Sequence, residues 1–128
     1  MPAWEDYKST AKERGALAFE LYLVETTVIG TGEALQATLP AHLVYQRELE
    51  SQGKLFLAGP TSDDSGELMQ GNGMIIYRAS SMAEADALAK GDPMHKENVR
   101  SYKLRKWLVN EGSPNFGTRL SSQSVIIS

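Results

Sequence analysis

The sequence predicts an α+β domain with the ferredoxin-like, split β-α-β-β-α-β order of elements and an antiparallel sheet, and three observations carry this prediction. Four segments have the alternating or continuous apolar residues that are typical of strands. Two segments with apolar residues at helical spacing separate the first strand from the second and the third from the fourth. The 128 residues, of which 41% are hydrophobic and 23% charged, suit a single globular domain.

The first strand and the first core helix are predicted in the first half of the chain. A strand is expected within residues 16–28, where apolar residues at the odd positions from 19 to 23 share one face. The helix after it is expected to begin at Pro40, because proline suits the first helical turn, and to end at Gly53, a common residue after a helix.

The second half is predicted to hold two more strands, a helix and a fourth strand. The helix is expected to open with a capping box formed by Ser81 and Glu84, and to stop before Gly91 and Pro93. Both core helices are expected to run in the same direction along the sheet. The three strands are expected at residues 54–60, 73–79 and 99–109.

The segments on either side of this region are expected to be appendages. We divide the chain into an N-terminal helical extension at residues 1–16, an α+β domain at 17–111 and a C-terminal tail at 112–128. The extension is expected to form a helix that ends at Gly15. The tail is expected to be mostly loop, with the apolar residues 124–128 adding an edge strand.

Two helices cover only one face of a four-stranded sheet, so the other face needs a cover. The simplest cover is a second copy of the chain packed sheet on sheet, which predicts a homodimer. The alternative is a monomer in which the tail covers this face.

Composition and charge exclude several classes of function. The net charge of −3 gives no basic surface for nucleic acid. No apolar run approaches the roughly 18 residues of a membrane span, and the absence of cysteine excludes disulfides and thiol chemistry. Two histidines and scattered acids give no metal-ligand spacing. We therefore expect a cytoplasmic protein without metal or cofactor, whose partner is a small molecule.

His42 and Asp92 are the residues whose positions ask for an explanation. His42 shares an apolar helix face with Tyr45 and Leu49, and Asp92 stands between the end of a helix and Pro93. With parallel helices, the topology alone does not bring the two side chains together. His42 can equally be a core histidine bonded to a backbone carbonyl, and Asp92 can simply cap the turn before the proline.

Two long segments resemble the YCII-like family of the dimeric α+β barrel superfamily. They are LPAHLVYQRELESQGKLFLAGP and GMIIYRASSMAEADALAKGDPMHKENVRSYKLRKW, and the resemblance spans about residues 17–111. It implies a ferredoxin-like dimer with a His-Asp pair at the active site, for which His42 and Asp92 are the matching positions. Some relatives are dehydrochlorinases or lie close to muconolactone isomerases, which act on small rings. The N-terminal extension and the tail depart from the family pattern.

Such a pair would carry out proton transfer. Histidine exchanges a proton near neutral pH, and a carboxylate on one ring nitrogen fixes the tautomer and stabilises the imidazolium. A position near the helix N-terminus would disfavour the charged form of His42, whereas Asp92 would favour it, and we expect the full charge of the carboxylate to dominate.

The sequence thus predicts a cofactor-free isomerase or dehydrohalogenase with His42 as base and Asp92 as its orienting group. The alternatives are a non-catalytic module that binds a small molecule and a structural dimer. His95 is close enough along the chain to compete with His42 for Asp92, or it lies at the surface. The expected substrate-binding residues are Tyr22, Tyr45, Gly59, Pro60 and His95.

Overall fold

The computed structural model describes residues 1–128, which form two compact units. The larger unit comprises residues 20–107, and the smaller unit combines residues 1–19 with residues 108–128. Each unit is described by itself below.

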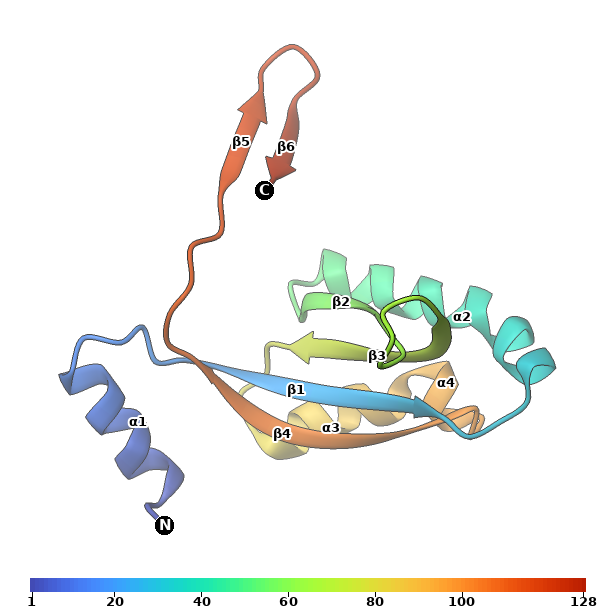
Figure 1. Cartoon of the computed structure of the whole chain (residues 1–128), viewed down its shortest axis with the longest axis horizontal. Helices are drawn as coiled ribbons and strands as arrows, with labels where there is room; N and C mark the ends of the chain where they lie inside the picture. Colours follow the sequence, from blue (N-terminus) through green and yellow to red (C-terminus); the bar gives the residue numbers. More distant parts are fainter. The chain divides into compact units, whose positions relative to one another are not determined.

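The larger unit has the predicted split β-α-β-β-α-β order, with one additional short helix before the last strand. Its sheet has the strand order β2-β3-β1-β4, with β3 antiparallel to both β1 and β2. Both core helices lie behind the sheet in the view of Figure 1. The elements are β1 (Phe19–Val28), α2 (Gly32–Ser51), β2 (Leu55–Ser62), β3 (Met69–Tyr77), α3 (Met82–Gly91), α4 (Pro93–Lys96) and β4 (Arg100–Val109).

Helix α2 begins eight residues before Pro40, so the prediction that Pro40 starts the helix is wrong. Thr31 is the N-cap, and its side chain accepts a hydrogen bond from the Ala34 N–H at 3.1 Å. Residues 32–39 are rich in good helix formers, and the helix continues through Pro40 although proline cannot donate to the carbonyl four residues earlier. This longer helix moves His42 from the first turn to the middle of α2.

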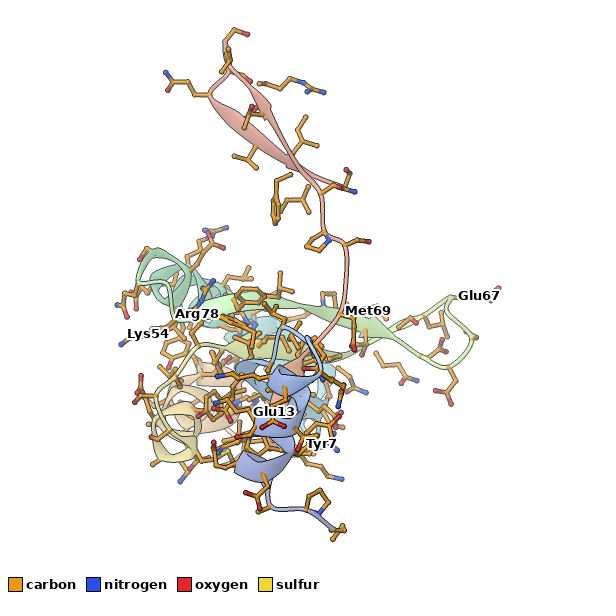
Figure 2. All side chains as sticks on the ribbon, turned by 90° about the vertical axis from the view of Figure 1, so that its left-hand side faces the viewer. Tyr7, Glu13, Lys54, Glu67, Met69 and Arg78 are labelled. Atoms are coloured by element: carbon orange, nitrogen blue, oxygen red, sulfur yellow. The ribbon has the colours of Figure 1, made fainter.

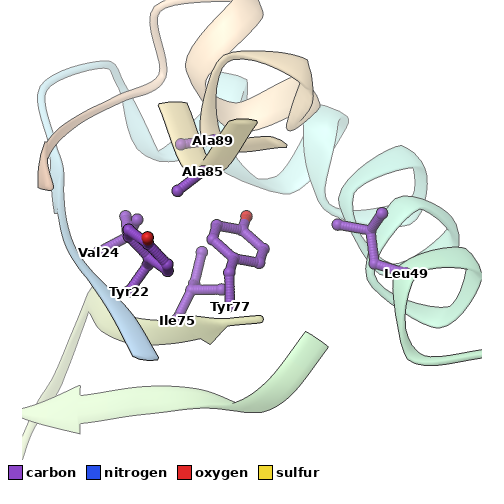
Figure 3. Packing of buried hydrophobic residues seen from close by; sticks show 7 residues of the cluster. All are labelled: Tyr22, Val24, Leu49, Ile75, Tyr77, Ala85 and Ala89. Carbon is purple, nitrogen blue, oxygen red and sulfur yellow. The ribbon is translucent and has the colours of Figure 1, made fainter. Parts of the chain in front are cut away.

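The core lies between the sheet and the helices. On β1 its members are Tyr22, Val24 and Thr26, which are at most 3% exposed. The even positions of β1 face α2 and α3, and Leu21, which is 1% exposed, belongs to the opposite face with the other odd positions. The helices contribute small or branched residues that allow close packing. The cluster in Figure 3 consists of Tyr22, Val24, Leu49, Ile75, Tyr77, Ala85 and Ala89.

The smaller unit contains α1 (Trp4–Glu13), β5 (Phe116–Arg119) and β6 (Ser124–Ile127). α1 is followed by Gly15, whose φ of 92° suits glycine and agrees with the predicted helix end. β5 and β6 pair antiparallel as a two-stranded sheet. The predicted strand at the C-terminus therefore exists, but it joins β5 instead of the edge of the main sheet. β5 itself was not predicted.

The loop from β2 to β3 projects from the sheet, with Glu67 on the loop and Met69 where β3 begins (Figure 2). Asp63 organises this loop, because its carboxylate accepts hydrogen bonds from both the N–H and the hydroxyl of Ser65. Those bonds hold the pKa of Asp63 below its usual value.

A glycine lets α3 and α2 approach closely. A Cβ placed on Gly91 would lie 2.6 Å from the hydroxyl of Tyr45, which donates a hydrogen bond to the Leu88 carbonyl at 2.7 Å. Any larger residue at position 91 would displace the ring and break this bond.

We predict that Gly91→Ala lowers the free energy of unfolding by about 1–3 kcal/mol, because the side chain overpacks the helix contact and costs a hydrogen bond. Gly32→Ala is the matched control, since a Cβ there meets nothing within 4 Å. Urea unfolding followed by circular dichroism measures both variants. Equal stabilities of the two variants would contradict the packing argument, and Tyr45→Phe should partly rescue Gly91→Ala.

Candidate active site

A buried histidine and a buried aspartate form a hydrogen-bonded pair between α2 and the junction of α3 with α4. The Nδ1 atom of His42 lies 2.8 Å from Oδ1 and 2.9 Å from Oδ2 of Asp92. The side chain of His42 is 7% exposed and that of Asp92 is 0% exposed. The ring nitrogen of His42 thus bonds a carboxylate and not a backbone carbonyl.

The pair forms because α2 and α3 run in opposite directions, which corrects the expectation that they run in the same direction. β1 and β3 are antiparallel, and each is followed by a helix that crosses back over the sheet. The start of α2 and the end of α3 therefore lie at the same end of the sheet (Figure 1). The short helix α4, directly after Asp92, packs against α2.

Asp92 also caps α4, so the capping interpretation and the pairing with His42 are both true. Its Oδ1 accepts a hydrogen bond from the Met94 N–H at 2.9 Å, and Pro93 occupies the first turn of α4. The rigid turn before and after Asp92 fixes its carboxylate, and the remaining acceptor capacity is directed at His42.

The carboxylate determines which ring nitrogen of His42 carries the proton. An ionised carboxylate can only accept hydrogen bonds, so Nδ1 of His42 must be the donor to Asp92. In the neutral ring Nε2 then carries the lone pair, and it makes no hydrogen bond within the protein. Because α2 begins at Gly32, His42 does not lie in the first helical turn, where the sequence predicted it.

His42 borders a cavity of about 200 Å³ between α2, β3 and the end of β2. This is smaller than the roughly 300–1,000 Å³ of sites for drug-sized ligands, so it suits a small molecule. Gly59 and Pro60 are in the wall, as expected. A Cβ on Gly73 would lie 2.8 Å from the Gly59 carbonyl oxygen, so glycine allows β2 and β3 to close the wall. The lining residues are Thr26, Leu39, His42, Leu43, Gln46, Gly59, Pro60, Met69, Asn72, Gly73, Met74, Ile75 and Arg100.

The two tyrosines expected to bind substrate do not line this cavity. Tyr22 is 3% exposed and belongs to the core cluster (Figure 3). Tyr45 spans the helix contact with its hydroxyl on the Leu88 carbonyl. Burial raises the pKa of Tyr45. Buried tyrosines commonly pack an apolar ring in the core and hydrogen-bond their hydroxyl group, which is a structural role.

The ring of His95 is buried beside the cavity wall and makes no hydrogen bond to the Asp92 carboxylate. Its Nδ1 lies 2.7 Å from the Ala89 carbonyl oxygen, and its Nε2 lies 2.8 Å from the Thr26 hydroxyl. Since a carbonyl only accepts, Nδ1 donates, and the Thr26 hydroxyl donates to Nε2 of the neutral ring. Burial is the main cause that lowers the pKa of His95. His95 therefore positions Thr26, which does line the cavity.

Sequence reasoning missed four polar residues of the wall, Thr26, Gln46, Asn72 and Arg100. The signal for two of them was strand alternation. Thr26 continues the even face of β1 that carries Tyr22 and Val24, and Arg100 shares its face of β4 with Tyr102. Asn72 carried no such signal, because it lies between Gly71 and Gly73, and glycine on both sides is more typical of a turn than of a strand.

The structure is a small α+β domain with a buried His-Asp pair beside a cavity, and a comparison with known families agrees with this fold. The model of the YCII-related domain matches residues 16–108, so the chain belongs to the YCII-related family. No curated protein matches the chain. A similar solved structure is 5-chloro-2-hydroxyhydroquinone dehydrochlorinase from Burkholderia phenoliruptrix in complex with 2,5-dihydroxybenzoquinone. It is 24% identical with a TM-score of 0.50, over 68% of this chain and 92% of that chain.

At this identity the structural likeness shows the fold. Two further findings describe the chain itself. No helix is both long and apolar enough to cross a membrane. No three histidine, cysteine, aspartate or glutamate side chains are grouped so that they could hold a metal ion.

We predict that His95 titrates below its ordinary pKa of about 6.5 and that Thr26→Val raises this value, because the Thr26 hydroxyl donates only to the neutral ring. The unfolded chain then binds the proton first, so this group's stabilising contribution is present above about pH 6.5 and is lost as the pH falls. The charged or titratable groups acting on His95 are Asp92, which raises its pKa, and Arg100 and His42, which lower it.

Proton NMR measures the titration, and the chain has only two histidines, so His42→Asn leaves one resonance to assign. A titration midpoint of His95 above its ordinary value in the wild type would contradict the burial argument. A midpoint unchanged by Thr26→Val would contradict the assigned direction of the Thr26 hydrogen bond.

Proposed function

We propose that this protein is a cofactor-free enzyme that transfers protons on a small ring compound, as an isomerase or as a lyase that eliminates HX. One observation carries the proposal. Asp92 binds Nδ1 of a buried histidine, so Nε2 of His42 is left as a base at the edge of a small cavity. His42 is the base and then the acid, and Asp92 orients it.

The chemistry balances without an added reagent. The lone pair on Nε2 takes a proton from a ring carbon or hydroxyl, and the Asp92 carboxylate stabilises the imidazolium that forms. In an isomerisation His42 returns the proton at another ring position. In an elimination the electron pair of the broken bond expels the leaving group as an anion, and the proton passes later to solvent. Positioned proton transfer of this kind contributes roughly 10²–10⁴-fold to a rate.

The comparison supports a ring compound as the substrate class. The dehydrochlorinase from Burkholderia phenoliruptrix carries a substituted hydroquinone in its name, and its structure contains 2,5-dihydroxybenzoquinone. The cavity of about 200 Å³ in the present chain is of a size for one such ring. In the non-catalytic alternative, the same cavity binds a ligand without turning it over, and product analysis separates the two.

We propose further that the face of the sheet opposite α2 and α3 binds a second copy of the chain. Leu57, Met74 and Trp107 on this face are 38–57% exposed. Together with Ile76 they line a shallow groove of about 350 Å³. An apolar sheet face of this kind is typical of an interface, and the antiparallel sheet of the family's fold is covered by helices on the opposite side only.

We expect His42→Asn to lower kcat by about 10²-fold or more, because no base remains at Nε2, while the amide can still donate to Asp92. Chloride release and product formation are measured on a panel of chlorinated and hydroxylated hydroquinones, starting with 5-chloro-2-hydroxyhydroquinone. Asp92→Asn should also lower kcat, since its amide oxygen keeps the contact but not the charge. Arg47→Gln is the control, because Arg47 is exposed on the same helix. Full turnover in His42→Asn would refute the proposal.

We expect sedimentation velocity to find a dimer, and Met74→Glu to produce monomers, because the new charge would be buried in the sheet-to-sheet contact. Val44→Glu is the matched control, since Val44 is 53% exposed on α2, away from the sheet face. A monomeric wild type, or a dimer that survives Met74→Glu as well as it survives Val44→Glu, would rule out this interface.

A further inference from the structure

Arg100 is a cation in the cavity wall that has no partner in the protein. It is the first residue of β4, and strand alternation puts it on the same face as Tyr102 and Leu104, which pack against the core. Its side chain is half-buried, and its Nε is fully enclosed without any hydrogen bond. It forms no ion pair. The negative charge of Asp92 attracts it from a distance.

A partly buried guanidinium without hydrogen-bond partners is energetically unfavourable. A guanidinium has five N–H donors and stays charged, so a partly buried one normally has carboxylate or carbonyl partners. Burial lowers the pKa of Arg100, but arginine remains protonated at neutral pH. The carboxylate of Asp92 is occupied by His42 and by the Met94 N–H. The donors of Arg100 are therefore available to a ligand.

The rest of the wall favours a ligand with an anionic oxygen. Asn72 accepts the Val28 N–H at 2.9 Å through Oδ1, which leaves its two amide N–H donors free of that contact. Gln46 adds another amide. No carboxylate lines the cavity, so Arg100 is its one fully charged side chain at a pH where His42 is neutral. An anion entering here meets a cation and amide donors and no like charge.

We propose that the cavity binds ring compounds that carry an anionic oxygen, either a carboxylate or an ionised phenol or enol, and that Arg100 holds this oxygen. This inference names the substrate class of the proposed function and rests on it for the reaction, although the binding itself can be tested separately. With a carboxylate, Arg100 anchors the ground state. With a ring hydroxyl that His42 deprotonates, Arg100 stabilises the oxyanion as it forms.

Binding of three probes of similar shape tests the proposal on the full chain. Benzoate and 4-nitrophenolate carry the anionic oxygen, and benzamide is the neutral analogue of benzoate. Titration followed by ¹H–¹⁵N NMR gives each Kd. We expect at least one anion to bind about tenfold or more tightly than benzamide, because charge-assisted hydrogen bonds are the stronger ones. Tighter binding of benzoate would identify a carboxylate as the preferred group, and tighter binding of 4-nitrophenolate would identify an ionised ring hydroxyl.

The variants assign the preference to Arg100. Arg100→Gln should remove it, Arg100→Lys should keep part of it, and Arg47→Gln, which removes an exposed positive charge from α2, should leave it unchanged. Because Arg100 has no partner to lose, thermal unfolding of Arg100→Gln should occur at or above the wild-type temperature. Equal Kd values for anions and benzamide, no anion binding at all, or a preference that survives Arg100→Gln would overturn the proposal.

Failure of this proposal is distinguishable from failure of the proposed function. His42→Asn should keep the preference for anions while it loses turnover. If turnover persists in His42→Asn and the preference remains, the base assignment is wrong and the anion site stands. If turnover is lost in His42→Asn but Arg100→Gln binds anions as the wild type does, the base assignment stands and the anion site at Arg100 is wrong.

Discussion

The contact between His42 and Asp92 is the constraint on which the rest of this structure depends. A carboxylate that is 0% exposed keeps its charge only if donors replace water, and here the donors are Nδ1 of His42 and the N–H of Met94. Breaking a buried pair by removing one partner commonly costs about 3–5 kcal/mol. The same contact that satisfies Asp92 also fixes the tautomer of His42, so the proposed chemical role and the structural role of the pair depend on one hydrogen-bonded contact.

Several residues near the pair in the sequence help to position His42 and Asp92. Pro93 fixes the turn in which Asp92 caps α4, and Gly91 leaves room for Tyr45 at the end of α3. Thr31 starts α2 early enough that His42 falls within a continuous helix despite Pro40. The ring of His95 bonds the Ala89 carbonyl and the Thr26 hydroxyl, and burial lowers its pKa, so the two histidine side chains have separate partners and do not compete for Asp92.

The order of elements and the family could be predicted from the sequence because both depend on local patterns. Ser81 and Glu84 marked α3, and the strand patterns were strong. Three features were missed for physical reasons. A capped run of good helix formers outweighed Pro40. The antiparallel pairing of β1 with β3, which reverses the second helix, is not local information. Arg100 and Thr26 became visible only when the strand faces were known, since one face of β1 looks as apolar as the other.

The tautomer of His42 in solution tests the account most directly. A long-range ¹H–¹⁵N NMR spectrum above the pH of histidine titration distinguishes Nδ1–H from Nε2–H. We expect Nδ1–H for His42 in the wild type, with Nε2 unprotonated, and a loss of this form in Asp92→Ala. An Nε2–H tautomer in the wild type would contradict it, because the cavity would then face a donor where the proposed chemistry needs a base.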